Sequence, residues 1–255
     1  MDALLELTEV DGGAGGKARG LARLAALGLP VPPALVLAPA AYRRWRERGA
    51  LADEDREALA SALDRLGTPL AVRSSAADED APDRSAAGQY ESVMGVETLP
   101  ALFAAVETCF QAAEGERAVT YRAERDVALA LVLQREVRAT RAGVAFSVDP
   151  VTGDAARVLV EAAFGHGERL VAGLVDPDRY WVDRVGGDVR ARIAAKPEVA
   201  PARRFARTLR DDEVRSLAGL VLRAEEGFAR PVDVEFCFDG PRPWLVQCRP
   251  ITALR

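Results

Sequence analysis

Two carboxylates share one face of a predicted strand near residue 235. Residues 232–238 alternate strictly between apolar side chains and the acidic residues Asp233 and Glu235. Successive side chains of a strand point to opposite faces, so the apolar residues supply a core and both carboxylates share the other face. Carboxylate oxygens are ligands that a hard cation such as Mg²⁺ prefers. The spacing therefore predicts a rigid acidic patch suited to a cation.

This strand is expected to form a hairpin. The turn residues at 239–243 precede a second strand whose polar members are Gln247 and Arg249. If the hairpin is symmetric about its central proline, Glu235 lies opposite Gln247 and Asp233 lies opposite Arg249. Amide and carboxylate oxygens suit Mg²⁺ that also binds phosphate, and a guanidinium can hold phosphate with two hydrogen bonds. A surface ion pair on a solvent-facing hairpin would give the same pattern, so both interpretations stay open.

A glycine-rich run at residues 12–17 predicts close backbone approach to a phosphate at the start of a helix. It is not a Walker A motif, because Asp11 replaces the leading glycine and Ala18 replaces the Mg²⁺-binding Ser or Thr. It fits the GxGxxA dinucleotide pattern, but no acidic residue follows the next predicted strand at 35–37, which excludes a Rossmann site. A flexible turn with a solvated Lys17 is the alternative interpretation.

Two further predicted strands end in polar residues. Arg73-Ser74-Ser75 follows the apolar stretch 69–72, and Glu161 lies near the end of strand 157–162, before a glycine-rich loop. Rigid strand ends can hold such side chains above a cleft. Each signal is weak alone, because polar residues and capped turns are common at strand ends.

The remaining pattern predicts alternating helices and strands. Helices are expected at 17–27, 40–46, 53–66, 100–124 and from 211 onward, and further strands at 34–37, 128–134, 143–148, 179–183 and 189–193. No internal repeat or low-complexity linker divides the chain. We therefore expect a single α+β unit over residues 1–255, with two lobes at about 1–125 and 126–255.

Composition excludes several classes of protein. The net charge is -5, and 34 basic residues are mixed with 39 acidic ones, so no basic stripe predicts a nucleic-acid partner. No segment offers the ~18 apolar residues of a membrane span, and we expect a cytoplasmic protein. Cys109, Cys237 and Cys248 lack CxxC spacing, and His166 is the only histidine, which argues against disulfides and zinc. Any catalysis would have to use Lys, Arg, carboxylates or amides, with or without a bound metal.

Together these motifs match one family in order. The matching segments are Gly15–Lys17, residues 28–33, Arg73–Ala76, residues 79–89, Arg117-Ala118, Gln134-Arg135, Gly143-Val144, Asp149-Pro150, Glu161-Ala162, Gly165–Glu168, Asp233–Glu235, Gln247 and Arg249–Thr252. The chain resembles the N-terminal ATP-binding domain of the phosphoenolpyruvate synthase and pyruvate phosphate dikinase family. This resemblance implies a bilobed ATP-grasp fold that binds the nucleotide in the cleft between its lobes.

The resemblance also implies site residues. Lys17, Arg73 and Arg249 would be catalytic and neutralise phosphates, while Glu235 and Gln247 would hold Mg²⁺. The implied ATP contacts are Lys17, Arg73, Ser74, Gly88, Gln89, Gln134, Glu136, Val137, Glu161, Gly165 and Arg249. Within that set, residues 134–137 would hold adenine through backbone groups, and Glu161 would lie near the nucleoside.

By the same resemblance, the chain would be an ATP-dependent phosphotransferase. It would pass a phosphoryl group from Mg-ATP to a histidine on a separate swivelling domain, with release of AMP, and an acceptor-binding protein would complete the system. We recognise neither that domain nor a pyruvate-binding barrel in residues 1–255. His166 is expected to be structural or near the nucleotide. Glu136, at a usual methionine position, leaves the base preference open.

Two alternative functions stay open at this point. One is a stand-alone ATP-grasp kinase or ligase that acts directly on a small molecule. The other is a non-catalytic ATP-sensing module. The presence of Lys17, Arg73, Glu235, Gln247 and Arg249 together argues against the sensing module, because binding alone does not require the whole transfer set.

Overall fold

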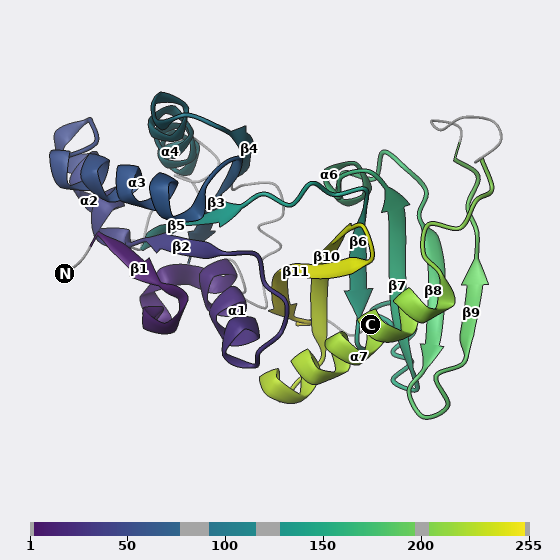
Figure 1. Ribbon diagram of the computed structural model, residues 1–255. Helices are drawn as coiled ribbons and strands as arrows, with labels where there is room; N and C mark the ends of the chain where they lie inside the picture. The colour runs from purple at the N-terminus through teal and green to yellow at the C-terminus, as the bar shows by residue number, and fades with distance from the viewer. Residues whose placement is uncertain (1–2, 77–91, 116–127, 197–203, 253–255) are drawn as a thin grey trace. The chain divides into compact units, whose positions relative to one another are not determined.

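The computed structural model describes residues 3–76, 92–115, 128–196 and 204–252 (Figure 1). The chain forms two compact units. The first unit comprises residues 1–22 and 32–136, and the second comprises residues 23–31 and 137–255. Both units contain an antiparallel sheet and helices, which confirms the predicted α+β class.

The first unit is built on a five-stranded antiparallel sheet with strand order β1-β2-β5-β3-β4. Its strands are β1 (Leu4–Glu6), β2 (Ala34–Leu37), β3 (Leu70–Ala76), β4 (Ser92–Val96) and β5 (Leu129–Arg135). Its helical elements are η1 (Leu7–Glu9), η2 (Gly12–Ala14), α1 (Gly15–Ala26, which continues into the second unit), α2 (Pro39–Arg48), α3 (Asp53–Leu66) and α4 (Leu99–Glu114).

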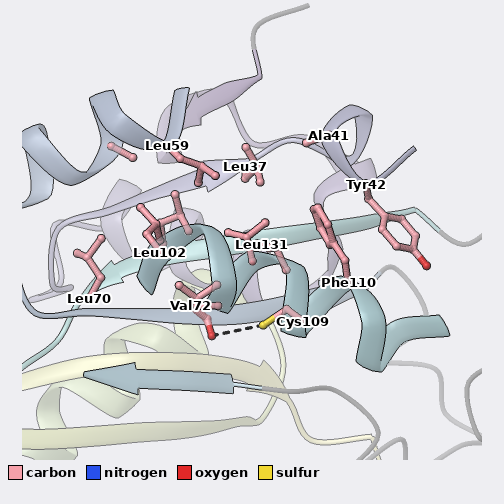
Figure 2. Close-up of a cluster of buried hydrophobic side chains, with 14 of the residues drawn as sticks. Leu37, Ala41, Tyr42, Leu59, Leu70, Val72, Leu102, Cys109, Phe110 and Leu131 are labelled. Atoms are coloured by element: carbon pink, nitrogen blue, oxygen red, sulfur yellow. Dashed lines mark hydrogen bonds between the residues drawn. The ribbon is translucent and has the colours of Figure 1, made fainter. Parts of the chain in front are cut away.

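Helices α2, α3 and α4 bury one face of this sheet. Leu70, Val72 and Leu131 alternate to that face and pack against Leu59 of α3 and Phe110 of α4 (Figure 2). The thiol of Cys109 in α4 donates a 3.9 Å hydrogen bond to the carbonyl of Val72 (Figure 2). The opposite face of the sheet is thereby defined by the intervening residues of each strand.

The second unit contains a six-stranded antiparallel sheet with order β11-β10-β6-β7-β8-β9. Its strands are β6 (Arg141–Phe146), β7 (Arg157–Phe164), β8 (Asp178–Asp183), β9 (Val189–Arg192), β10 (Val232–Asp239) and β11 (Arg242–Pro250). The long helix α7 (Asp211–Phe228) packs along one face of the sheet, and the short α6 (Glu168–Val171) follows β7 (Figure 1).

Most predicted elements are confirmed, with informative differences. Strand β3 continues through Arg73–Ala76, which the prediction placed after the strand, because the backbone of these residues pairs with β5. The sequence did not indicate β1 or β4, since these short strands carry mostly exposed or half-exposed residues. All three cysteines are free and buried, as predicted. No helix within the described ranges is long and apolar enough to cross a membrane.

A buried ion pair joins Asp178 of β8 to Lys196, which follows β9. Lys196 Nζ lies 2.6 Å from Asp178 Oδ1, and both side chains are almost fully buried. The same carboxylate accepts hydrogen bonds from the backbone of Ala194 and from the backbone and hydroxyl of Thr208. Burial raises the pKa of Asp178, but Lys196 and these hydrogen bonds outweigh it, so the pKa lies below its ordinary value.

Replacing this carboxylate should destabilise the protein in a pH-dependent manner. We expect Asp178→Asn to lower the free energy of unfolding by about 3 kcal/mol at pH 7, because Lys196 keeps a buried charge without its partner. Because the pKa of Asp178 is lower in the folded protein than in the unfolded chain, the ionised carboxylate stabilises the fold fully above the unfolded pKa of about 4. This stabilisation is lost as the pH falls through the pKa of the folded protein. The difference between wild type and variant should therefore shrink below about pH 4.

Urea unfolding of both proteins from pH 3 to pH 8 measures this difference. Asp188→Asn is the matched control, because Asp188 is exposed in the turn before β9. A deficit of the Asp178→Asn variant that stayed constant over this range would contradict the interpretation.

Candidate functional site

The glycine-rich run lies on the face of the first sheet that α2, α3 and α4 do not cover. The hydroxyl of Ser75 in β3 donates to the carbonyl of Ala14 at 2.8 Å and accepts from the backbone N–H of Ala18 at 3.1 Å. Ser75 is fully buried, so these two bonds fix the start of α1 against the strand. Lys17 is part of that first helical turn.

Gly15 is required by this contact. Its φ is 83°, and a Cβ there would lie 2.4 Å from the backbone carbonyl atoms of Ser75. Any other residue would push the helix start away from β3. The glycine therefore serves close backbone packing as well as the turn that precedes Lys17.

The alternation of β3 separates the predicted Arg73 and Ser74. Arg73 and Ser75 share the face that carries the glycine-rich run, whereas Ser74 alternates to the helix-covered face and is fully buried. Ser75, which the sequence grouped with both residues, is the one with hydrogen bonds to the glycine-rich run. The structure thus brings Arg73 and this run to one face and turns the Ser74 side chain away from it.

Gln134 contributes an unsatisfied buried amide to the same face. It lies opposite Ala34 and Ala71 and is 3% exposed. Within the described residues, its Nε2 has no hydrogen-bond partner. A buried donor without an acceptor costs about 1–3 kcal/mol, so such a group indicates a missing ligand or solvent. The neighbouring Glu136 is tied to β4, because its carboxylate accepts the Gly95 N–H at 2.6 Å.

In the second unit, the predicted hairpin register is confirmed. Glu235 pairs with Gln247 and Asp233 pairs with Arg249. The apolar residues of β10 pack under α7, so these four polar side chains share the face away from that helix. We call this the front face of the second sheet.

A β-bulge at Val246 produces this register. The turn is shorter than predicted, because Asp239 and Arg242 already pair around a two-residue loop. With regular pairing from that loop, Glu235 would meet Val246, and Gln247 would alternate to the α7 side. The extra residue at Val246 shifts the pairing by one and returns Gln247 to the front face.

Glu161 lies on the front face in the same cross-strand row as Glu235. We call this row, Glu235–Val144–Glu161, the polar row. Its predicted position at a strand end was wrong, because β7 continues to Phe164. Glu161 lies opposite Val144 of β6, which lies opposite Glu235 of β10. Strands are spaced about 4.8 Å apart, so Glu161 is about 10 Å from Glu235 along this row. One cation at Glu235 would therefore not reach both carboxylates directly.

Electrostatics at the hairpin favour a cation. Arg249 Nε donates to Asp233 Oδ2 at 3.0 Å, while 52% of the Arg249 side chain stays exposed. Burial raises the pKa of Asp233, Arg249 opposes this shift, and the charge of Glu235 adds to it. Two carboxylates that lie two positions apart on one strand give a negative field, which suits an additional positive charge.

The oxygen donors fit Mg²⁺ better than a metal held by the protein alone. Glu235 and the buried Gln247 offer one carboxylate and one amide side by side. Across the described ranges, no group of three or more His, Cys, Asp or Glu side chains is arranged to hold a metal. Mg²⁺ typically uses one or two protein carboxylates and completes its shell with water and phosphate.

The other predicted residues lie as follows. Val137 is half-buried at the start of the second unit after β5, and Gly165 follows β7 with a φ of 85°. The Gly165 N–H donates to the carbonyl of Thr140 at 2.8 Å. His166 is exposed in this loop. Gly88 and Gln89 lie outside the described residues.

Comparison with known proteins identifies a family match over most of the chain. Residues 51–255 match the family model described as the pyruvate phosphate dikinase, AMP/ATP-binding domain. The match covers both strands of the β10–β11 hairpin as well as Glu161 and Gln134.

Three relatives have similar sequences over nearly the whole chain. Prodigiosin synthesizing transferase PigC of Serratia marcescens is 35% identical over 93% of the chain. A rifampicin phosphotransferase of a Streptomyces species is 40% identical over 80%, and a probable phosphoenolpyruvate synthase of Methanocaldococcus jannaschii is 30% identical over 95%. The matched region is 31%, 26% and 26% of these proteins respectively, so the chain spans less than a third of each.

Substitution of Gly15 tests the packing of the glycine-rich run. We expect Gly15→Ala to lower the free energy of unfolding by about 3 kcal/mol, from the strained φ and the overlap with Ser75. Gly12→Ala is the control, because a Cβ at Gly12 meets nothing within 4 Å. Urea unfolding measures both variants. Equal stability of the two would show that α1 does not depend on this contact.

Proposed function

The chain belongs to the pyruvate phosphate dikinase AMP/ATP-binding domain family and has the α+β ATP-grasp fold expected of it; on that premise we propose that it is an ATP-dependent phosphotransferase component. It binds Mg-ATP and passes one phosphoryl group to a histidine on a separate partner protein. AMP is released, and the other phosphoryl group is transferred to water and leaves as inorganic phosphate. In this proposal residues 1–255 form one nucleotide-binding domain.

The arrangement of the hairpin carries this proposal. Glu235 and Gln247 present oxygen ligands directly beside the Asp233–Arg249 pair, on one face of a sheet held by α7. In phosphoryl transfer the protein mainly positions the reacting groups and stabilises the spreading negative charge. An exposed guanidinium next to a Mg²⁺ site supplies both functions. A solvent-facing hairpin would not require the buried Gln247 or the bulge that orients it.

The first unit would bind the nucleotide through donors. Lys17 and Arg73 supply positive charge for the phosphates, from two segments that Ser75 holds together. The unsatisfied Nε2 of Gln134 supplies a buried donor at the strand that leads to the proposed adenine contacts of Glu136 and Val137. The further proposed ATP contacts are Gly88, Gln89, Glu161, Gly165 and Arg249. Ser74 is not among them, because its side chain is buried on the helix-covered face.

Magnesium would be held by Glu235 and Gln247 together with phosphate oxygens. When bound, it neutralises phosphate charge and orients the reacting phosphoryl group. Arg249 would contact the phosphate in transfer, with its guanidinium oriented by Asp233. No general base in this chain is needed, because the partner's imidazole is itself the nucleophile.

A nucleotide assay tests the proposed reaction. The purified chain is incubated with Mg²⁺ and ATP, and ATP, ADP, AMP, phosphate and pyrophosphate are resolved, with and without the proteins encoded beside it. We expect AMP only when a histidine-bearing partner is added, together with an acid-labile phosphate on that partner. ADP formation with a small-molecule acceptor alone would instead establish a kinase or ligase. Tight ATP binding without turnover under every condition would indicate a sensing module.

In this assay, Arg249→Gln should slow phosphoryl transfer by about 100-fold, because the transferred phosphate loses a charged hydrogen-bond donor. The glutamine amide can still donate to Asp233, so the hairpin should stay folded. Arg242→Gln is the matched control, since Arg242 is exposed on the same strand and packs on the Trp244 ring. Undiminished transfer in Arg249→Gln would remove Arg249 from the site.

Gln134→Met should separate ATP binding from stability. The apolar side chain of similar size removes an unsatisfied buried donor, so the free energy of unfolding should stay equal or rise by about 1 kcal/mol. If Nε2 serves ATP, the affinity should fall about tenfold. Calorimetry and urea unfolding measure the two effects, with the exposed Gln111→Met of α4 as control. A destabilised variant with unchanged ATP affinity would show that Gln134 is structural.

A further inference from the structure

A cross-strand ion pair continues the polar row of the front face. Arg179 of β8 lies directly opposite Glu161 of β7, and its Nε donates to Glu161 Oε1 at 2.6 Å. Strand alternation places both side chains on the face away from α7. Glu161 keeps 20% of its side chain exposed, so its carboxylate is reachable from that face. None of the matched motifs included Arg179.

The geometry leaves one carboxylate oxygen available. Oε1 of Glu161 accepts the bond from Arg179, and no hydrogen bond joins Oε2 to another described residue. The other neighbour of Glu161 in the row, Val144, is apolar and offers no competing donor. A carboxylate with one fixed oxygen and one open oxygen is a directed hydrogen-bond acceptor.

Arg179 is itself held on the side away from Glu235. The next residue across the sheet is Arg192, an exposed like charge on the edge strand β9. Repulsion between directly opposed arginines favours the Arg179 guanidinium turned toward Glu161. Arg179 also contributes to the lowered pKa of Asp149, although burial opposes that shift and the N–H groups of Val151 and Thr152 contribute more.

We propose that Arg179 is a positioning residue that orients Glu161 so that Oε2 accepts a hydrogen bond from a ribose hydroxyl of the bound nucleotide. This inference rests on the proposed function, since it assigns a specificity role within the same ATP site. The row supports it, because Glu161 lies about 10 Å from Glu235, too far to share its cation but within the length of a nucleotide. A carboxylate at that point recognises hydroxyl donors and not phosphates.

A merely structural pair makes a different prediction. If Arg179 only joined β7 to β8, its loss would weaken ATP and a ribose-modified nucleotide equally. If Arg179 positions Glu161, its loss should weaken only the binding of a nucleotide that carries ribose hydroxyl groups. The ratio of the two affinities therefore distinguishes the roles.

The experiment measures the dissociation constants of ATP and of 2′,3′-dideoxy-ATP by calorimetry in the presence of Mg²⁺. Wild type should bind ATP about tenfold more tightly than dideoxy-ATP, because dideoxy-ATP cannot form the hydrogen bond to the charged Glu161 carboxylate. Arg179→Leu should weaken ATP about tenfold and leave dideoxy-ATP unchanged, so that the ratio approaches one. Arg179→Lys should restore part of the ratio, because an ammonium can still reach Glu161.

Arg157→Leu is the matched control, because Arg157 lies on the same face of β7 and pairs with Asp154 at 3.4 Å. It should keep the wild-type ratio. A preserved ratio in Arg179→Leu, or an equal loss for both nucleotides, would overturn the positioning role while the proposed function stands. If wild type bound neither nucleotide, the proposed function and this inference would both fail.

Discussion

The register of the β10–β11 hairpin is the constraint on which the site depends. Val234 and Phe236 are buried beneath α7, so β10 cannot slip by one residue without exposing them and burying Asp233 and Glu235. The two-residue turn alone would then give the wrong pairing for β11. The bulge at Val246 corrects it and aligns an amide and a guanidinium with the two carboxylates. A local backbone irregularity thus sets the pairing on which the proposed site depends, and the core of the sheet keeps it in place.

The front face concentrates charged side chains. Asp233 and Glu235 are two positions apart on one strand, and burial of Asp233 makes its ionised form costly. Arg249 donates from Nε to Asp233, and Arg179 donates from Nε to Glu161. By contrast, the deeper Asp178 receives a lysine and several hydrogen bonds. Asp178 is thus held by several partners inside the fold, whereas we propose that the carboxylates of the front face receive ligands.

The sequence predicted the β10–β11 hairpin correctly, because apolar and polar side chains alternate there with the two-residue repeat of a strand. The strict alternation of residues 232–238 predicted both the buried face and the opposing polar pairs. The prediction failed where pairing with a neighbouring strand determines the end of a strand or the neighbour of a side chain. Strand β7 continues two residues beyond its predicted end, because Ala163 and Phe164 pair with β6, so Glu161 was misplaced at a strand end. Arg179 acquires its role only from its register with β7, which joins residues 18 positions apart. Ser74 and Ser75 are adjacent in sequence, yet alternation sends them to opposite faces.

The two units carry chemically different sets of side chains. The first offers donors and positive charge, namely Lys17, Arg73 and the unsatisfied amide of Gln134. The second offers mainly acceptors, the oxygens of Glu235, Gln247 and Glu161, with Arg249 as the cationic exception. Polyphosphate alone matches the first set, and a hydrated cation alone matches the second. Mg-ATP carries phosphate anions, a metal and ribose hydroxyls in one molecule, so it satisfies both sets together.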